Sequence, residues 1–189
     1  MNKILINYST EAVAAYQIVS RLDMLLFMPI LGIAISLTTI VGMFYGAKEF
    51  DKLLSVVYYG INRAVIITTI SVLLFFVLAN SILPIFSSNS LVVDIGVTYL
   101  KIIILVYPAV GISVICSRVC QALGQGMPLL ITTITRVIIL TAPLSYYFYF
   151  TGRPIEWVWF SQVFAILIAA TISFAWMRYY FRKFNIVRN

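Results

Sequence analysis

Five long apolar runs, separated by short polar segments, set the pattern of this chain. They cover residues 24–47, 64–85, 102–117, 128–150 and 157–177. A helix of about 20 apolar residues crosses the roughly 30 Å of hydrocarbon in a bilayer. The third run reaches this length because Lys101 and Arg118 at its ends can extend to the interface. The runs lack the alternation of barrel strands, so the sequence predicts an all-α integral membrane protein with five transmembrane helices.

The polar segments between the runs have the composition of turns. Ser, Asn, Gly and Pro gather at 87–90, 124–128 and 151–154, and these residue types favour turns over continued helix. The predicted helices, with their flanks, cover residues 10–47, 55–85, 95–122, 128–150 and 156–182. All five belong to a single membrane domain that comprises residues 1–189.

The first helix is expected to begin well before its apolar run. Ser9 or Thr10 followed by Glu11 is typical of a helix start, with an acid near the positive end of the helix dipole. Arg21 and Asp23 then fall just ahead of the apolar run, on different faces of the helix, and we expect both to be interfacial anchors. None of the five runs contains Asp or Glu, so the sequence predicts no carboxylate inside the membrane.

The composition supports a membrane protein and argues against several other classes. Of the 189 residues, 62% are hydrophobic and 10% are charged, with a mean hydropathy of +1.04, whereas soluble domains have about 45–50% and 25%. The net charge of +7 is scattered between the apolar runs, which argues against nucleic-acid binding. The sequence has no His, and its two Cys, Cys116 and Cys120, lie in one apolar run. We therefore expect no enzyme activity, no metal site, no cofactor and two buried thiols.

Basic residues flank the predicted helices unequally. One side carries Lys48, Lys52, Arg63, Arg118, Arg178, Arg182, Lys183 and Arg188. The other side carries Lys3, Arg21, Lys101 and Arg153. Because cytoplasmic flanks hold the excess of Lys and Arg, we expect a multi-pass protein of the cell membrane with its C-terminus in the cytoplasm and, after five spans, its N-terminus outside.

Two features inside the runs favour a transporter over a passive anchor. Pro29, Pro108 and Pro143 interrupt three of the five runs, and each Pro removes a helix hydrogen bond and bends the helix. Arg136 lies about 12 Å into the fourth run at 1.5 Å per residue. A charge at that depth must be hydrated or paired, or must extend to the surface. Arg136 therefore either reaches the cytoplasmic surface or lines a hydrated cavity.

A series of short motifs resembles one family of membrane transporters. The motifs are TEAVAAY (10–16), SRL (20–22), MPILG (28–32), TTIVG (38–42), YGA (45–47), YLKI (99–102), YP (107–108) and QALGQG (121–126). Pro143, Trp157 and the basic tail after Trp176 continue the series. In this order and spacing the motifs resemble one lobe of the multidrug and toxic compound extrusion (MATE) transporters, over nearly the whole chain.

The resemblance implies a function and a missing part. MATE transporters have two six-helix lobes and export cationic or amphipathic compounds in exchange for protons or sodium by alternating access. The chain would be the C-terminal lobe without its first helix. A missing N-terminal lobe or second subunit would then complete the passage, since substrate binds between lobes. The implied partners are the lipid bilayer and small organic cations, and the implied coupling ion of the complete transporter is H⁺ or Na⁺.

Four side chains are candidate substrate-binding groups. They are Tyr107, Gln121, Arg136 and Gln162. One branch of the family carries a Tyr and, four residues later, an Asp at its cation site, and the matching positions here are Tyr107 and Gly111. The tyrosine is present and the acid is absent, so the resemblance leaves this chain without a carboxylate for ion coupling.

Two other interpretations stay open on the sequence alone. A lipid-linked polysaccharide flippase of the same superfamily would use cationic cavity residues such as Arg136 to bind anionic headgroups. From a different class, the chain would be an inactive truncated product or a structural membrane subunit.

Overall fold

The computed structural model describes residues 2–186, and all regular structure within them is helical. In chain order the segments are α1 (Asn2–Leu5), α2 (Thr10–Gly46), α3 (Phe50–Phe86), α4 (Ser90–Ile104), α5 (Tyr107–Ala122), α6 (Met127–Ile134), the π-helix η1 (Thr135–Thr141), α7 (Ala142–Phe150) and α8 (Glu156–Lys183). Four spans are long and apolar enough to cross a membrane: α2, α3, the continuous stretch Met127–Phe150 and α8. The bent pair α4 and α5 makes a fifth. The predicted five-helix membrane fold is confirmed.

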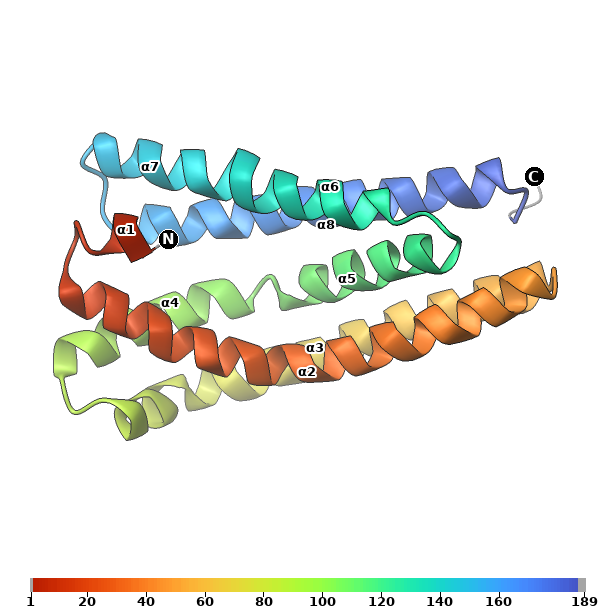
Figure 1. Cartoon of the computed structure of the whole chain (residues 1–189). Helices are drawn as coiled ribbons and strands as arrows, with labels where there is room; N and C mark the ends of the chain where they lie inside the picture. The colour runs from red at the N-terminus through yellow and green to blue at the C-terminus, as the bar shows by residue number, and fades with distance from the viewer. Residues whose placement is uncertain (1, 187–189) are drawn as a thin grey trace.

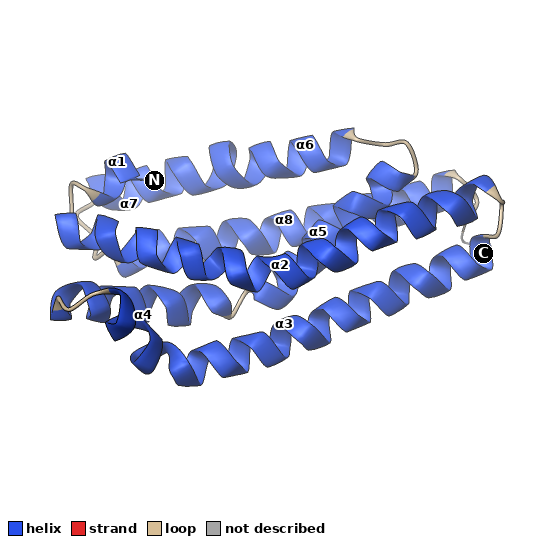
Figure 2. Cartoon of the chain, turned by 60° about the horizontal axis from the view of Figure 1, so that its bottom comes forward, coloured by secondary structure: helices blue, strands red, loops and turns tan. Residues whose placement is uncertain are grey.

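The helices lie side by side in an elongated bundle, with α4 and α5 between two pairs of long helices (Figures 1 and 2). On one side α5 packs against α2 and α3, which also pack against each other. On the other side it packs against α8 and α6. The bent span α4–α5 thus has protein neighbours on both sides.

Apolar side chains form two core clusters. Near the N-terminal end of α2, Tyr99 of α4 packs against Trp159 of α8 with ring centroids 4.2 Å apart. The second cluster contains Leu37 of α2, Leu53 of α3 and both cysteines. Cys116 and Cys120 are buried and form no disulfide, as expected of thiols in an apolar helix interface.

Hydroxyl groups join helices where the bundle is tightly packed. Ser173 of α8 lies 3.1 Å from the Ser113 hydroxyl and 3.2 Å from the Ser117 hydroxyl, both on α5. Ser145 of α7 and Ser161 of α8 are likewise 2.8 Å apart. Small hydroxyl side chains let helices approach closely and hydrogen-bond in a membrane, where water does not drive helix association.

Four helices end in the same backbone turn. After α2, α5, α7 and α8, a residue with positive φ is followed by a residue whose N–H donates to the carbonyl five positions back. The positive-φ residues are Lys48, Gly124, Gly152 and Asn185. After α5, for example, Gly124 has a φ of 79° and Gln125 N–H donates to Cys120 at 2.9 Å. This Schellman arrangement satisfies otherwise unpaired helix carbonyls.

The three prolines inside the predicted spans affect the helix backbone differently. Before Pro108, α4 and α5 meet at a bend of 51°. Before Pro143, the α-helix passes into the π-helix η1, which continues directly into α7. By contrast, α2 continues through Pro29 as one helix. The predicted interruption is therefore a sharp bend in one span and a local change of helix type in another.

Two helices begin earlier than the sequence predicted. The helix expected over 55–85 begins at Phe50, and the one expected over 95–122 begins at Ser90. Asp51 lies in the first turn of α3, where an acid complements the helix dipole. The Asn89 side chain accepts a hydrogen bond from Leu91 N–H and so caps α4. Polar residues assigned to connections thus belong to helix ends.

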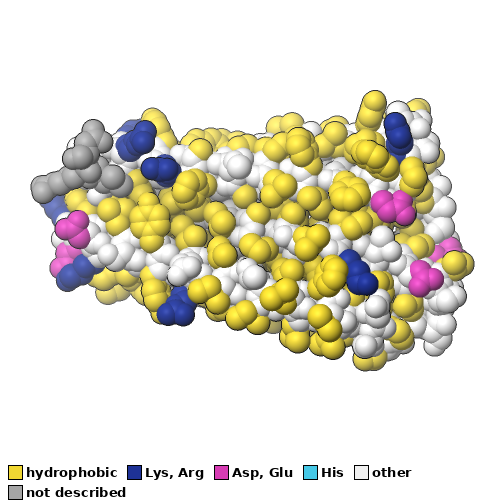
Figure 3. Space-filling view, turned by 180° about the vertical axis from the view of Figure 1, so that it is seen from behind, with side chains coloured by type: hydrophobic (Ala, Val, Ile, Leu, Met, Phe, Trp, Pro, Cys, Tyr) yellow, Lys and Arg dark blue, Asp and Glu magenta, His cyan; other side chains and the backbone are white. Residues whose placement is uncertain are grey.

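The surface has the polarity of a protein surrounded by lipid. On the face shown in Figure 3, hydrophobic side chains cover the middle, and most Lys, Arg, Asp and Glu side chains lie toward the two ends. The α2–α3 and α5–α6 connections lie at the end of the bundle where α8 ends, and the α3–α4 and α7–α8 connections lie at the other (Figure 1). Of the basic residues that favoured one orientation, Arg188 lies outside the described residues.

Candidate functional site

A cavity of about 460 Å³ lies between α2, the α4–α5 bend, η1 and α8. Six of its lining residues have polar groups: Tyr16, Asp23, Tyr107, Arg136, Thr141 and Gln162. The others are apolar and include Met24, Phe27, Ile103 and Ile166. An apolar cavity with a few convergent polar groups is the usual form of a small-molecule site. Three of the four predicted site residues, Tyr107, Arg136 and Gln162, line it.

Both irregular helix segments border this cavity. Ile103 lies just before the α4–α5 bend and Tyr107 just after it, and both line the cavity. Arg136, Val137 and Thr141 belong to the π-helix. Bends and π-turns redirect side chains that a straight α-helix would place elsewhere, and π-bulges occur often at functional sites.

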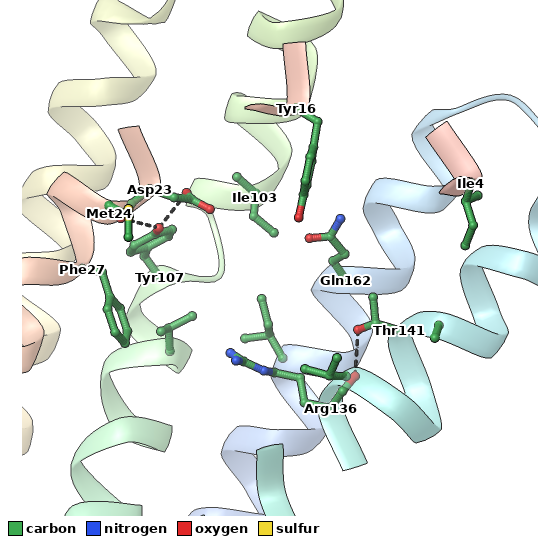
Figure 4. Close-up of a pocket in the computed structure, with 14 residues that line it drawn as sticks. Ile4, Tyr16, Asp23, Met24, Phe27, Ile103, Tyr107, Arg136, Thr141 and Gln162 are labelled. Carbon is green, nitrogen blue, oxygen red and sulfur yellow. Dashed lines mark hydrogen bonds between the residues drawn. The ribbon is translucent and has the colours of Figure 1, made fainter. Parts of the chain in front are cut away.

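The shortest polar contact in the cavity joins α2 to α5. The Tyr107 hydroxyl donates to Asp23 Oδ1 at 2.6 Å and also lies 3.3 Å from the Asp23 backbone carbonyl oxygen (Figure 4). Tyr107 is 5% exposed, and Asp23 is half-buried. A short hydrogen bond from a hydroxyl to a carboxylate is charge-assisted and favours the charged form of the acid.

Asp23 has contacts that the sequence did not predict. We expected no carboxylate inside the apolar runs, and we expected Arg21 and Asp23, just ahead of the first run, to be interfacial anchors. In the structure Asp23 is 13 residues into α2, about 20 Å from the helix start at 1.5 Å per residue, and it lines the cavity. Arg21 is exposed on another face. The helix begins at Thr10, as predicted, and Asp23 lies on the face of α2 that lines the cavity.

Gly111 cannot supply the acid that the family branch places four residues after its tyrosine. A Cβ at Gly111 would meet Thr68 Cγ2 at 3.6 Å and Ala64 Cβ at 3.7 Å. Gly111 therefore faces α3 and is not among the residues that line the cavity. In this chain the carboxylate next to Tyr107 comes from α2 instead.

Arg136 enters the cavity from the wall opposite Asp23 and Tyr107 (Figure 4). Its side chain is half-buried, and no ion pair among residues 2–186 includes it. Its backbone carbonyl accepts a hydrogen bond from the Thr141 hydroxyl at 2.8 Å. This bond lies inside η1, so it supports the irregular backbone that directs Arg136 into the cavity.

Gln162 of α8 lies beside an aromatic wall. Its Oε1 accepts a hydrogen bond from the Tyr99 hydroxyl at 3.3 Å. Tyr16 and Trp159 stack nearby with an angle of 1° between their planes. The Gln162 amide nitrogen and the Trp159 indole nitrogen are buried and have no hydrogen-bond partner among the described residues. Unpaired buried donors are uncommon and call for an explanation.

Gln121, the fourth candidate, lies elsewhere. It is exposed near the C-terminal end of α5, and its Oε1 accepts a hydrogen bond from Arg118 at 3.0 Å. It does not line the cavity. The QALGQG motif, which contains Gln121, forms the end of α5 and the turn that follows.

The sequence-based reasoning missed Asp23, Tyr16 and Thr141 as cavity residues. For Asp23 a signal was available, because the helix start at Ser9 and Thr10 puts it more than three turns inside the helix. Tyr16 lies two turns before Asp23 on the same helix, so the helix start at Ser9 and Thr10 places Tyr16 inside the helix as well. Thr141 is in the cavity because of the π-helix, which the sequence did not predict.

Membrane-spanning helices around a cavity that holds a carboxylate and a guanidinium are typical of integral membrane transport proteins. The chain belongs to the MatE family, since the sequence profile of that family matches residues 1–147. The predicted membership of the MATE transporters is confirmed.

Known relatives are similar over almost all of this chain. The probable multidrug resistance protein YoeA of Bacillus subtilis strain 168 is 24% identical over 183 residues, which are 96% of this chain and 40% of YoeA. A MOP superfamily transporter from Pyrococcus furiosus has a similar fold, with a TM-score of 0.89, 24% identity, and coverage of 100% of this chain and 42% of the other.

A third relative is the MATE transporter ClbM, solved in complex with Rb⁺. It is 26% identical with a TM-score of 0.86, and the match covers 92% of this chain and 41% of ClbM. The chain thus spans less than half the length of the relatives it matches, consistent with one lobe. The family match does not favour the flippase-like alternative.

Proposed function

We propose that this chain is one lobe of an ion-coupled exporter of small organic cations, in which Asp23 and Tyr107 form the ion-exchange site. The lobe works with a second lobe, supplied by another stretch of protein, that closes the substrate passage. The coupling ion is H⁺ or Na⁺. The lobe lies in the cell membrane with the basic end of the bundle, where α8 ends, on the cytoplasmic side.

The observation that carries this proposal is the Asp23 carboxylate inside the cavity, held by Tyr107 at 2.6 Å. A carboxylate in a membrane helix is expensive unless it is paired, protonated or hydrated, and such residues mark ion and proton pathways. No ion pair among the described side chains includes Asp23. The site therefore has a fixed acceptor and no permanent cation from the described chain.

Exchange follows from the presence of one carboxylate. A proton, a sodium ion or an organic cation can each neutralise Asp23, and binding of one lowers the affinity for the others because only one negative charge is available. Tyr107 keeps the carboxylate in one position and favours its charged form. The apolar lining from Met24, Phe27 and Ile166 suits the body of an amphipathic substrate.

Two relatives support the proposal at the level of the family. YoeA carries the name of a probable multidrug resistance protein, and ClbM has been solved with the monovalent cation Rb⁺. The missing length is also relevant, since this chain covers 40–42% of YoeA and the Pyrococcus furiosus transporter. A passage between lobes needs more protein than these five spans provide.

The proposal can be tested by binding of tetraphenylphosphonium, a lipophilic organic cation. The full chain is purified into lipid nanodiscs, and affinity is measured by calorimetry at acidic and alkaline pH, with and without Na⁺. We expect affinity to fall either at acidic pH or with added Na⁺, which also identifies the coupling ion. Asp23→Asn, which keeps the size of the side chain, is expected to weaken binding about tenfold or more, or about 1.4 kcal/mol.

Asp94→Asn is the matched control, because Asp94 is an exposed acid of α4 that does not line the cavity. Its affinity and ion dependence should equal those of the wild-type chain. If Asp23→Asn binds tetraphenylphosphonium with unchanged affinity and unchanged ion dependence, Asp23 is not the exchange site and the proposal fails.

A further inference from the structure

One face of α8 is exposed along the whole helix and ends in two arginines. The exposed residues on this outer face are Trp157, Phe160, Phe164, Leu167, Thr171, Ala175, Arg178 and Arg182. They follow one another at steps of three and four, so they lie within about 80° of one another around the helix axis. The outer face is therefore mostly apolar along the membrane span and basic in its last two turns.

The outer face points away from the cavity and from the rest of the bundle. Gln162 and Ile166 of α8 line the cavity, and Ser173 and Met177 are buried among the other helices. These four residues lie roughly 100–160° around the helix axis from Arg178. A second lobe that faces the cavity would therefore leave the outer face of α8 in contact with lipid.

The two guanidinium groups of the outer face have no anion of their own. No ion pair among the described side chains includes Arg178 or Arg182, and neither guanidinium has a hydrogen-bond acceptor there. Arg178 lies over the Phe174 ring, 5.9 Å from its centre. Glu49, an acid at the same end of the bundle, is already paired with Lys52 at 2.9 Å. The described chain thus leaves both guanidinium groups available to an anion from outside it.

The two arginines lie where lipid headgroups are found. The apolar run of α8 ends at Met177, and Arg178 follows it directly. Arg182 is four residues further on, about 6 Å along the axis at 1.5 Å per residue, so both arginines can reach one phosphate. On the membrane side of Arg178, Thr171 and Ala175 are small and leave room beside the helix for the start of an acyl chain.

We propose that the outer face of α8 binds an anionic phospholipid, whose phosphate lies on Arg178 and Arg182. One acyl chain runs along Ala175, Thr171 and Leu167. A guanidinium pairs with phosphate through two parallel hydrogen bonds and does so better than an ammonium. In the orientation proposed above, this end of the bundle faces the cytoplasmic leaflet, which carries the anionic lipids.

The charge of the outer face favours an anionic headgroup over a zwitterionic one. Both headgroups carry a phosphate, but a choline group adds a positive charge close to two guanidinium groups, which is unfavourable. A glycerol headgroup adds no charge and can hydrogen-bond. Discrimination thus arises from repulsion of the wrong lipid as well as from attraction of the right one.

Native mass spectrometry tests the proposal by counting bound lipids. The full chain is purified in detergent and titrated with equal amounts of phosphatidylglycerol and phosphatidylcholine that have the same acyl chains. We expect phosphatidylglycerol to bind about tenfold more tightly than phosphatidylcholine. The double variant Arg178→Gln with Arg182→Gln should lose this preference through weaker binding of phosphatidylglycerol, with phosphatidylcholine unchanged.

Arg63→Gln is the matched control. Arg63 is an exposed arginine of α3 that also lies over an aromatic ring, 4.9 Å from the centre of Tyr59, but α3 has no second basic residue one turn away from it. This variant should keep the full preference. Circular dichroism and gel filtration establish that each variant is folded. If the double variant does not fold, Arg178→Gln and Arg182→Gln are tested singly, and each should reduce the preference about threefold.

The outcomes separate this proposal from the proposed function. Equal binding of the two lipids by the wild-type chain overturns it, as does a preference that is undiminished when the arginines are replaced. A lipid-free dimer that forms only while both arginines are present also overturns it, because the outer face is then an interface between two copies of the chain. Cation binding at Asp23 does not depend on any of these results, so the proposed exporter function stands whichever is found.

Discussion

At the scale of single residues, the pair Asp23 and Tyr107 forms the proposed ion-exchange site. The two side chains come from α2 and α5, 84 positions apart in the sequence, and the hydroxyl-to-carboxylate distance is 2.6 Å. Tyr107 is buried beside the α4–α5 bend, so its hydroxyl has little freedom to leave the acid. The residue that supplies the charge and the residue that holds it therefore act together.

Tyr107→Phe should weaken cation binding while leaving the carboxylate in place. A hydrogen bond to a charged group contributes about 1.5–3 kcal/mol, and its loss disfavours the charged form of Asp23. We expect the affinity for tetraphenylphosphonium to fall about tenfold at neutral pH, as measured by calorimetry. Tyr59→Phe removes an exposed hydroxyl from α3 and serves as the control. Unchanged affinity in Tyr107→Phe would mean that the hydroxyl does not support the site.

The candidate site was predictable from the sequence only in part. Tyr107, Arg136 and Gln162 could be named because polar side chains inside apolar runs are few. Asp23 was assigned to the interface because its charge ends the apolar run, although the helix continues for 13 residues before it. The apolar run measures hydropathy and not the length of the helix, so a charged residue at its edge can still lie inside the bundle.

At the scale of helices, α2 and α3 approach closely at Gly60. A Cβ at this position would lie 3.0 Å from Leu37 Cγ, closer than ordinary van der Waals contact, and would overlap a Leu37 methyl group. Gly60 and Leu37 are both buried where the two long helices pack together. The absence of a side chain at Gly60 thus permits the contact that joins the first two spans.

Gly60→Val should destabilise the bundle by about 1–3 kcal/mol, the usual effect of overpacking a well-packed core. Thermal unfolding in detergent, followed by circular dichroism, should show a lower midpoint for this variant. Adding Leu37→Ala should recover part of the loss, because the smaller side chain makes room for the valine. Gly32→Ala is the control, since nothing lies within 4 Å of its Cβ position. No effect of Gly60→Val would show that Leu37 moves aside without cost and that Gly60 does not limit the packing of the two helices.

The helices themselves were largely predictable, and their irregular segments were not. Apolar runs of membrane-spanning length predicted all five spans, and Pro108 predicted the break that became a 51° bend. The π-helix has no comparable signal in TRVIILT (135–141). Pro143 lies two residues after this segment and has no N–H to donate to the carbonyl of residue 139. Which part of the helix changes its hydrogen bonding as a result depends on packing against α8.

At the scale of the whole molecule, the described chain is a lobe and not an enclosed passage. Almost the full length of the chain, with its five spans, matches larger transporters. It covers 40% of YoeA and 42% of the Pyrococcus furiosus protein. The proposed exporter function therefore requires a second surface, outside this lobe, that faces the cavity.

Expression of the chain alone in drug-sensitive cells should give no ion-dependent efflux of ethidium. One lobe can bind a cation, but alternating access needs two bodies that move against each other around the site. Efflux is measured by dye fluorescence after a proton or sodium gradient is applied, with an intact drug exporter in the same cells as the positive control. Gradient-dependent efflux from cells that contain only this chain would contradict the need for a second lobe.

The central claim, that Asp23 exchanges one cation for another, is tested most directly by counting the ions displaced. Tetraphenylphosphonium is added to the full chain in nanodiscs in weakly buffered solution, and released protons and released radioactive sodium are measured per bound molecule. The account predicts close to one ion displaced for each cation bound by the wild-type chain and none at this site in Asp23→Asn. Binding that displaces neither ion, or displacement that persists in Asp23→Asn, would contradict it.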